Sequence, residues 1–285
     1  MAREQRRAEA PTWIGREIST TEVVGDGPVR GLIATLESRE VAPQPGDSLP
    51  LLAHWLYGLS YTPLADAGPD GHARRGGLAP PVAPPRRMWA GSDISFHRPL
   101  RIGATFTRRS TVGDVTEKEG RSGRLMFVRI DHALSDGDGP ILDEAQTLVY
   151  RDPPVPGAPS PEPQPGPAEH QWQRQIVPDP VLLFRYSALT FNSHRIHYDR
   201  RYAMEVEGYP GLVVHGPLIA TLLLHELIAH HPAADVASFS FRAVRPLFDT
   251  APFFVSGSLD GAGSAALFAS DKSGALCVSA TAVLR

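Results

Sequence analysis

Four polar residues that could hold a water molecule and move a proton, Asn192, His194, His197 and Asp199, are packed into eight consecutive positions. An imidazole titrates near neutral pH and therefore suits general acid–base catalysis. An asparagine amide can orient a water molecule but cannot accept its proton. His194 and His197 are three positions apart, which predicts that both lie on one face of a short helix capped by Asn192 or Ser193.

A second segment, residues 209–217, is an apolar run that ends in His215-Gly216-Pro217 and directly precedes the apolar residues 218–229. Gly-Pro before such a run predicts a helix start, and a helix that is apolar nearly all round is buried. Backbone N–H groups at that start could stabilise a developing enolate oxygen. Beside a water-holding group, this indicates hydration of an α,β-unsaturated thioester or the reverse dehydration.

Other interpretations of these residues remain open. His194 and His197 could be structural and bond backbone carbonyls, and His215 could act only as a helix cap. A His-x-x-His pair could bind zinc, but no carboxylate or cysteine stands at a familiar spacing, so we expect no metal site. The sequence contains no Gly-x-Ser-x-Gly elbow, no P-loop and no dinucleotide fingerprint after a strand.

Composition narrows the class of protein. The chain has 285 residues, 42% of them hydrophobic, a net charge of −3 and one cysteine, Cys277. This charge does not favour nucleic acid, and one cysteine cannot form an internal disulfide. No apolar run reaches the roughly 18–20 residues that span a bilayer, and the first ten residues lack an apolar signal region. We therefore expect a cytoplasmic protein that binds neither nucleic acid nor membrane.

The elements that must position these residues occur in a repeated order. We expect a buried helix at residues 48–60 and a long Gly- and Pro-rich loop at 63–87, followed by strands that end at Tyr150. A Pro-rich linker follows, and the second half repeats a buried helix and then strands. This predicts an α+β arrangement in which antiparallel sheets wrap two helices and pair edge to edge. The predicted units are residues 1–151, a linker at 152–168, and residues 169–285.

Residues 184–199 and 209–217 resemble the MaoC-like, or R-specific hydratase, branch of the hot-dog superfamily. The nearest resemblance is to two-domain members with a FAS1-type dehydratase N-terminal region. Six motif residues fall in register: Tyr186, Ser187, Leu189, Thr190, Ile196 and His197. The sequence departs from the family motif at four positions, where its aspartate, asparagine, proline and glycine are replaced by Asn192, His194, Arg195 and Phe191.

The resemblance implies a double hot-dog whose second half hydrates a 2-enoyl-CoA thioester reversibly. It favours a short branched dicarboxylic substrate, itaconyl-CoA or mesaconyl-C4-CoA, giving citramalyl-CoA. The implied catalytic residues are His197, Asn192, His194 and Gly216. The expected substrate-binding residues are His215, Arg195, Arg86 and Arg87. No cofactor is expected beyond the CoA thioester, which is itself the substrate.

Three alternatives accompany this interpretation. The first is a 3-hydroxyacyl-thioester dehydratase of fatty-acid metabolism. The second is a hot-dog thioesterase, for which Glu226 would be the acidic base on the central helix. The third is a non-catalytic acyl-CoA-binding protein, which the replacement of the aspartate by Asn192 supports. A double hot-dog already contains its pair, so a monomer suffices physically, although the family often forms homo-oligomers.

Overall fold

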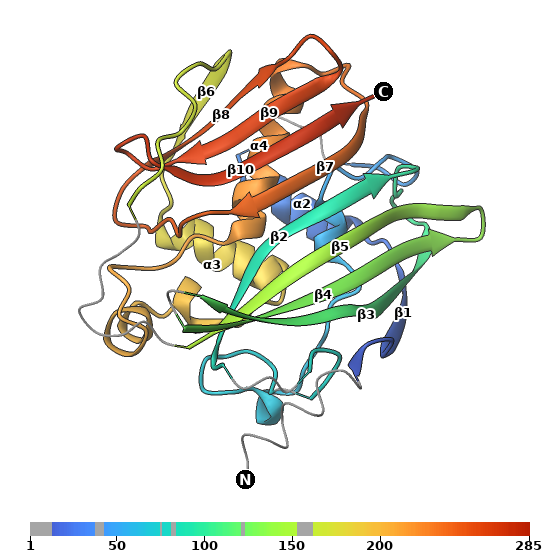
Figure 1. Ribbon diagram of the computed structural model, residues 1–285. Helices are drawn as coiled ribbons and strands as arrows, with labels where there is room; N and C mark the ends of the chain where they lie inside the picture. Colours follow the sequence, from blue (N-terminus) through green and yellow to red (C-terminus); the bar gives the residue numbers. More distant parts are fainter. Residues whose placement is uncertain (1–12, 38–42, 75, 81–83, 121–122, 153–161) are drawn as a thin grey trace.

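A computed structural model describes residues 13–37, 43–74, 76–80, 84–120, 123–152 and 162–285 of the protein. Its strands form one ten-stranded antiparallel sheet in the order β1-β3-β4-β5-β2-β7-β10-β9-β8-β6. Strands β1 to β5 come from the first half of the chain and β6 to β10 from the second, so the order is mirrored about the β2–β7 junction (Figure 1).

The elements of the first half are β1 (Glu17–Val23), α2 (Asp26–Thr35), the 3-10 helices η2 (Ala53–Leu56) and η3 (Leu64–Asp66), β2 (Arg86–Phe96), β3 (Thr105–Gly120), β4 (Gly123–Asp136) and β5 (Gly139–Arg151). Those of the second half are β6 (Trp172–Ile176), α3 (Pro180–Leu189), the 3-10 helix η4 (Arg195–His197), the π-helix η5 (Tyr202–Val206), α4 (Gly216–His230), β7 (Val236–Ala243), β8 (Phe253–Leu259), β9 (Ser264–Ser270) and β10 (Leu276–Leu284).

The junction between β2 and β7 joins the halves. The two strands pair antiparallel from Gly91↔Arg242 to Ser95↔Ser238, which confirms the predicted edge-to-edge pairing. Gly91 is required there because a Cβ atom would lie 2.2 Å from the carbonyl oxygen of Phe241. Residues 153–161 of the expected linker lie outside the described residues, and Pro165 forms an isolated bridge with Ala275.

Helix α4 is the buried helix predicted at residues 218–229, and the strands of the second half curve around it (Figure 1). Its buried side chains are nearly all aliphatic, from Leu218 through Leu227. Each such side chain contributes about 1.5–3 kcal/mol when it leaves water, so burial stabilises the helix, which has no side-chain hydrogen bond at its N-cap, His215. Its first residue, Gly216, is thereby fixed against the middle of the sheet.

The prediction of a buried helix over residues 48–60 is wrong. Only Ala53–Leu56 are helical, as one 3-10 turn, because Leu52 has a left-handed backbone (φ 66°) and Gly58 another (φ 62°). The segment is nevertheless buried as expected.

Two side chains of this segment, His54 and Trp55, bond the buried carboxylate of Glu144 on β5. Burial alone would raise the pKa of Glu144, but the hydrogen bond and charge of His54 lower it to about 2. Trp55 donates to the same carboxylate at 3.0 Å.

Among the described residues of the first half, the α-helix is α2, which sequence patterning did not indicate. Its sequence, DGPVRGLIAT, contains two glycines and a proline, so its intrinsic helix propensity is low. Packing compensates, since Val29 and Leu32 are buried. Gly31 permits close contact with α3, because a Cβ atom there would lie 2.6 Å from the Leu189 side chain.

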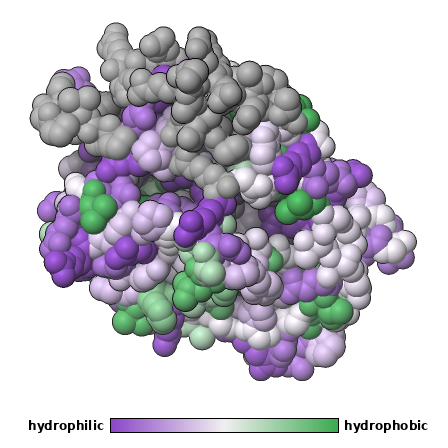
Figure 2. All heavy atoms as spheres, turned by 90° about the horizontal axis from the view of Figure 1, so that it is seen from below, coloured by the Kyte–Doolittle hydropathy of each residue, from purple (hydrophilic) through white to green (hydrophobic). Residues whose placement is uncertain are grey.

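Among the described residues, no helix is both long and apolar enough to cross a membrane. On the face seen from below, hydrophobic residues lie in small groups separated by hydrophilic ones (Figure 2).

Candidate active site

The motif residues lie in a tight turn between α3 and η4. Phe191 has a left-handed backbone (φ 48°), which is the conformation that favours glycine, the residue that the hydratase motif has at this position. The turn lets the Asn192 N–H donate to the Ser187 carbonyl at 2.8 Å. The Asn192 side-chain oxygen accepts the His194 N–H at 3.1 Å. The predicted short helix is therefore a 3-10 turn over Arg195–His197. Asn192 bonds the backbone of His194, the residue directly before this turn.

His197 is held in the tautomer that a base needs. Its Nδ1–H donates to the Val213 carbonyl at 2.7 Å, so Nε2 carries the lone pair. Burial lowers the pKa of His197 to about 4, and the Val213 hydrogen bond opposes that shift only in part. The ring is therefore neutral at pH 7 and able to accept a proton.

His215 is buried against His197. The two rings are stacked, with centroids 3.7 Å apart and 18° between their planes. Ser187 Oγ and His215 Nε2 share a hydrogen bond of 2.8 Å. Burial holds the pKa of His215 well below its usual range, and only 1% of the residue is exposed. The structure thus places His215 against His197, and the substrate-binding role of His215 stays a prediction.

His194 lies edge-on to His197, with centroids 5.4 Å apart and 88° between the planes. Its other neighbour is His72 from the first half, whose ring centroid is 4.0 Å away. Burial, then the charges of His72, His197 and Arg87, push the pKa of His194 far below its usual range. His194 is thus a neutral, buried imidazole between two other histidines.

Gly216 begins α4, where a helix N–H has no acceptor within the helix. The positive end of the helix dipole is at the same point. The protein leaves space over this glycine, because the nearest atom to an added Cβ would be the Trp89 carbonyl oxygen at 3.8 Å. The space beside Gly216 is thus open, and the predicted contact of its amide with a thioester oxygen stays a prediction.

The three arginines expected to bind substrate differ in their surroundings. Arg86 opens β2 and pairs with Glu207 at 2.9 Å. Arg195 pairs with Asp199 at 2.7 Å, and its guanidinium lies over the Tyr202 ring. These two guanidinium groups thus already have carboxylate partners, and their substrate-binding role stays a prediction. Arg87 is half-buried on β2 and forms no ion pair within the part of the chain that the structure describes.

Sequence analysis missed Asp70 and His72. They lie in the long loop predicted at residues 63–87, more than 120 positions before His194, so no spacing connects them to the motif. Asp70 Oδ2 and His72 Nδ1 are 3.2 Å apart. One ligand atom each from Asp70, His72 and His194 lies within 4.8 Å of the others, so the three could hold a divalent cation if the Asp70–His72 hydrogen bond were given up.

Comparison with known proteins decides the family. Residues 52–249 match the sequence model of the family described as hydroxyacyl-thioester dehydratase type 2. The chain belongs to this family. It is 47% identical over 247 residues to a mesaconyl-C(4)-CoA hydratase of Chloroflexus aurantiacus, covering 86% of this chain and 88% of that one.

A mitochondrial hydroxyacyl-thioester dehydratase type 2 of Schizosaccharomyces pombe is 26% identical over 76% of this chain and 78% of its own length. A crystal structure of a MaoC-like dehydratase from Phytophthora capsici superposes with a TM-score of 0.70 at 18% identity, covering 95% of both chains. The predicted MaoC-like hot-dog fold is therefore confirmed, and the chain is a hydro-lyase.

Proposed function

We propose that this hydro-lyase hydrates a short, branched, dicarboxylic enoyl-CoA, with mesaconyl-C4-CoA favoured over itaconyl-CoA, to give citramalyl-CoA. The observation that carries the proposal is the 47% identity to the mesaconyl-C(4)-CoA hydratase along nearly the full length of both chains. The arrangement of His197 and Gly216 supports it, because the two supply a base and an oxyanion donor on adjoining segments.

The chemistry starts from a water molecule that Asn192 orients. His197 Nε2 takes one of its protons while the water oxygen forms a bond to the β-carbon. The π electrons of the double bond move toward the thioester, and the Gly216 N–H at the start of α4 holds the enolate oxygen. Protonation of the α-carbon completes the hydration. The thioester itself stabilises the enolate, so this chemistry requires no metal or redox cofactor.

The substrate carboxylate can be placed by the same chemistry. In mesaconyl-C4-CoA the β-carbon that water attacks also carries the free carboxylate, so that group must lie beside the activated water. Of the three arginines considered, Arg86 and Arg195 are already paired with carboxylates. Arg87 forms no ion pair with a carboxylate among the described residues, and its charge contributes to the lowered pKa of His194. We therefore assign the distal carboxylate to Arg87.

The test is loss of the conjugated enoyl absorbance of mesaconyl-C4-CoA, with crotonyl-CoA and itaconyl-CoA beside it. His197→Ala should lower turnover about 10²–10⁴-fold, the usual contribution of general acid–base catalysis, and because it also removes a buried ring, circular dichroism at the assay temperature checks that the variant is folded. The exposed His170→Ala is the control. Activity that survives in His197→Ala contradicts the site. Release of free thiol indicates a thioesterase, and binding without any turnover indicates an acyl-CoA-binding protein.

Recognition of the distal carboxylate by Arg87 is tested by comparing kcat/KM for two substrates. Hydrogen bonds to charged groups contribute about 1.5–3 kcal/mol, so Arg87→Met should reduce kcat/KM for mesaconyl-C4-CoA by about 10- to 100-fold. Crotonyl-CoA has no distal carboxylate, so its kcat/KM should change little. Arg201→Met, at an exposed surface ion pair, is the control. Equal losses with both substrates would remove Arg87 from carboxylate recognition.

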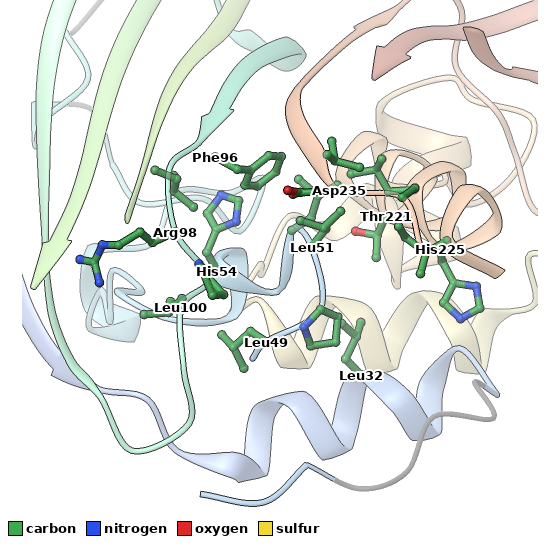
Figure 3. Close-up of a pocket in the computed structure, with 18 of the residues that line it drawn as sticks. Leu32, Leu49, Leu51, His54, Phe96, Arg98, Leu100, Thr221, His225 and Asp235 are labelled. Carbon is green, nitrogen blue, oxygen red and sulfur yellow. The ribbon is translucent and has the colours of Figure 1, made fainter. Parts of the chain in front are cut away.

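One observation favours the fatty-acid alternative. A cavity of about 600 Å³ lies between the halves, alongside α2 and α4, and its lining is largely aliphatic (Figure 3). Residues that line it include Leu32, Leu49, Leu100, Leu224 and Ile228. A straight acyl chain would fit its volume, although none of His194, His197 and Gly216 is among the residues that line it. A kcat/KM that rises steadily with acyl length, and that Leu224→Trp abolishes only for long chains, would favour this second function.

A further inference from the structure

A small hairpin from the first half carries two titratable groups to the motif of the second half. Residues 64–74, here called the Asp70 loop, begin with η3 and close through an isolated bridge between Ala67 and Ala73. Within it the Gly68 N–H donates to the His72 carbonyl at 2.6 Å. The loop therefore has its own internal structure and presents Asp70 and His72 from its tip.

The Asp70 loop is docked against the motif by several backbone contacts. The Arg195 N–H donates to the Asp70 carbonyl at 2.9 Å, and Arg195 Nη1 donates to the Pro69 carbonyl at 3.1 Å. Ser193 Oγ donates to the Gly71 carbonyl. Gly71 has a φ of 88°, and a Cβ atom there would lie 1.8 Å from the Ser193 carbonyl oxygen. This close approach fixes where the side chains of the loop lie.

Asp70 orients His72. One oxygen of its carboxylate lies 3.2 Å from His72 Nδ1, and the other accepts the His72 backbone N–H at 3.1 Å. Burial alone would raise the pKa of Asp70, but the hydrogen bond and charge of His72 lower it overall. The carboxylate is thus ionised at neutral pH. With Nδ1 bonded to Asp70, Nε2 is the other ring nitrogen that can carry a proton.

The pair lies beside His194, which in turn lies beside His197. The His72 ring is 4.0 Å from that of His194, which in turn lies 5.4 Å from that of His197. The side chain of His72 is 19% exposed and that of Asp70 29%, so protons can pass between this pair and solvent. Asn192 stands where the related hydratase motif has its aspartate, so the motif itself supplies one base, His197.

We propose that the Asp70–His72 pair is the second acid–base group of the hydratase reaction, contributed by the first half of the chain. This inference rests on the proposed function. In hydration, His197 Nε2 takes a proton from water as the C–O bond forms at the β-carbon. The His72 imidazolium gives its Nε2 proton to the α-carbon, where the enolate electron pair forms the new C–H bond. Solvent returns a proton to His72 and removes one from His197.

An exchange experiment separates the two groups. Methylsuccinyl-CoA, the saturated analogue of mesaconyl-C4-CoA, cannot lose water, so deuterium uptake at its α-carbon in D2O reports only α-proton transfer. Mass spectrometry of the thioester measures that uptake. His197→Ala should keep the exchange while it loses hydration. His72→Gln should lose both, and Asp70→Asn should slow both by about 10- to 100-fold, while the exposed His170→Gln changes neither.

The opposite pattern overturns the proposal. If exchange disappears in His197→Ala and persists in His72→Gln, His197 is the single base. If a chelator abolishes wild-type hydration and zinc restores it, Asp70, His72 and His194 are metal ligands and the proposal also fails. A wild type that hydrates no enoyl-CoA would instead refute the proposed function. A wild type that hydrates mesaconyl-C4-CoA, with unchanged exchange in His72→Gln, refutes only the second acid–base group. Melting temperatures of the variants separate lost chemistry from lost folding.

Discussion

The rings of His215 and His197 are stacked with their centroids 3.7 Å apart, and one nitrogen of each ring is hydrogen-bonded to a different residue. Val213 holds His197 through Nδ1, and Ser187 holds His215 through Nε2. His197 therefore cannot rotate without disturbing a second buried ring. An orientation that is fixed on two sides keeps Nε2 aimed at one point, which is what general base catalysis requires.

The stack itself can be tested by substitution at His215. His215→Phe keeps a ring under His197, whereas His215→Ala removes it and leaves a cavity that should cost about 2–4 kcal/mol of stability. We expect turnover to fall much further in the alanine variant. The phenylalanine variant leaves the Ser187 hydroxyl unpaired at a cost of about 1–3 kcal/mol, so adding Ser187→Ala should recover stability. Equal turnover in the two single variants would mean that the stack does not position His197.

The pH profile follows from the pKa of His197. The base must be neutral, and burial lowers its pKa to about 4. The requirement for a neutral base should therefore cause no loss of kcat/KM as pH falls from 7 to 5, and a decrease only as pH approaches 4. A stopped-flow pH profile, with the fold monitored by circular dichroism, measures this. An acid limb near 6.5, the ordinary value for histidine, would mean that His197 is more solvated than the structure shows.

Restoring the carboxylate with Asn192→Asp should move that acid limb. The Asp side chain can still accept the His194 N–H, which Asn192 accepts at 3.1 Å. A nearby negative charge favours the protonated imidazole, so the limb should shift toward higher pH by about one unit or more. The comparison is kcat/KM of both proteins across pH 4 to 8. An identical profile would show that this position only orients water.

Gly71→Ala should detach the Asp70 loop. The added methyl group would meet the Ser193 carbonyl oxygen at 1.8 Å, so the loop must move away from the motif. Gly76→Ala is the matched control, since Gly76 also has a positive φ but no atom within 4 Å of an added Cβ. We expect at least a tenfold loss of hydration for Gly71→Ala beyond that of Gly76→Ala. Equal losses of hydration activity in the two variants would show that backbone strain, and not displacement of the Asp70 loop, causes the loss.

Gly216→Ala probes the oxyanion donor. The protein itself tolerates a Cβ atom here, because the nearest contact, 3.8 Å to the Trp89 carbonyl oxygen, is an ordinary one. The melting temperature should therefore hold, whereas a methyl group beside the amide should obstruct the thioester and lower kcat by about 10- to 100-fold. An unchanged kcat would place the thioester oxygen elsewhere.

The elements that follow from local patterning were predictable. The apolar run at 218–229 became α4, and the strands of both halves formed the predicted continuous sheet. The local signal failed where backbone conformation depended on tertiary packing. Leu52 adopts a left-handed conformation inside an apolar run, and α2 forms from a Gly-containing sequence because Gly31 lets Leu189 approach.

By itself the sequence determined the motif, with Asn192 and His194 just upstream of His197 and with Gly216 at the start of a buried helix, because short spacings and residue types can be recognised locally; the catalytic roles stay predictions. Only the tertiary structure decided which residues act together across the chain. It placed His215 behind His197, gave Arg86 and Arg195 carboxylate partners, and brought Asp70 and His72 to His194. Such contacts arise when the two halves pack, and no local spacing encodes them.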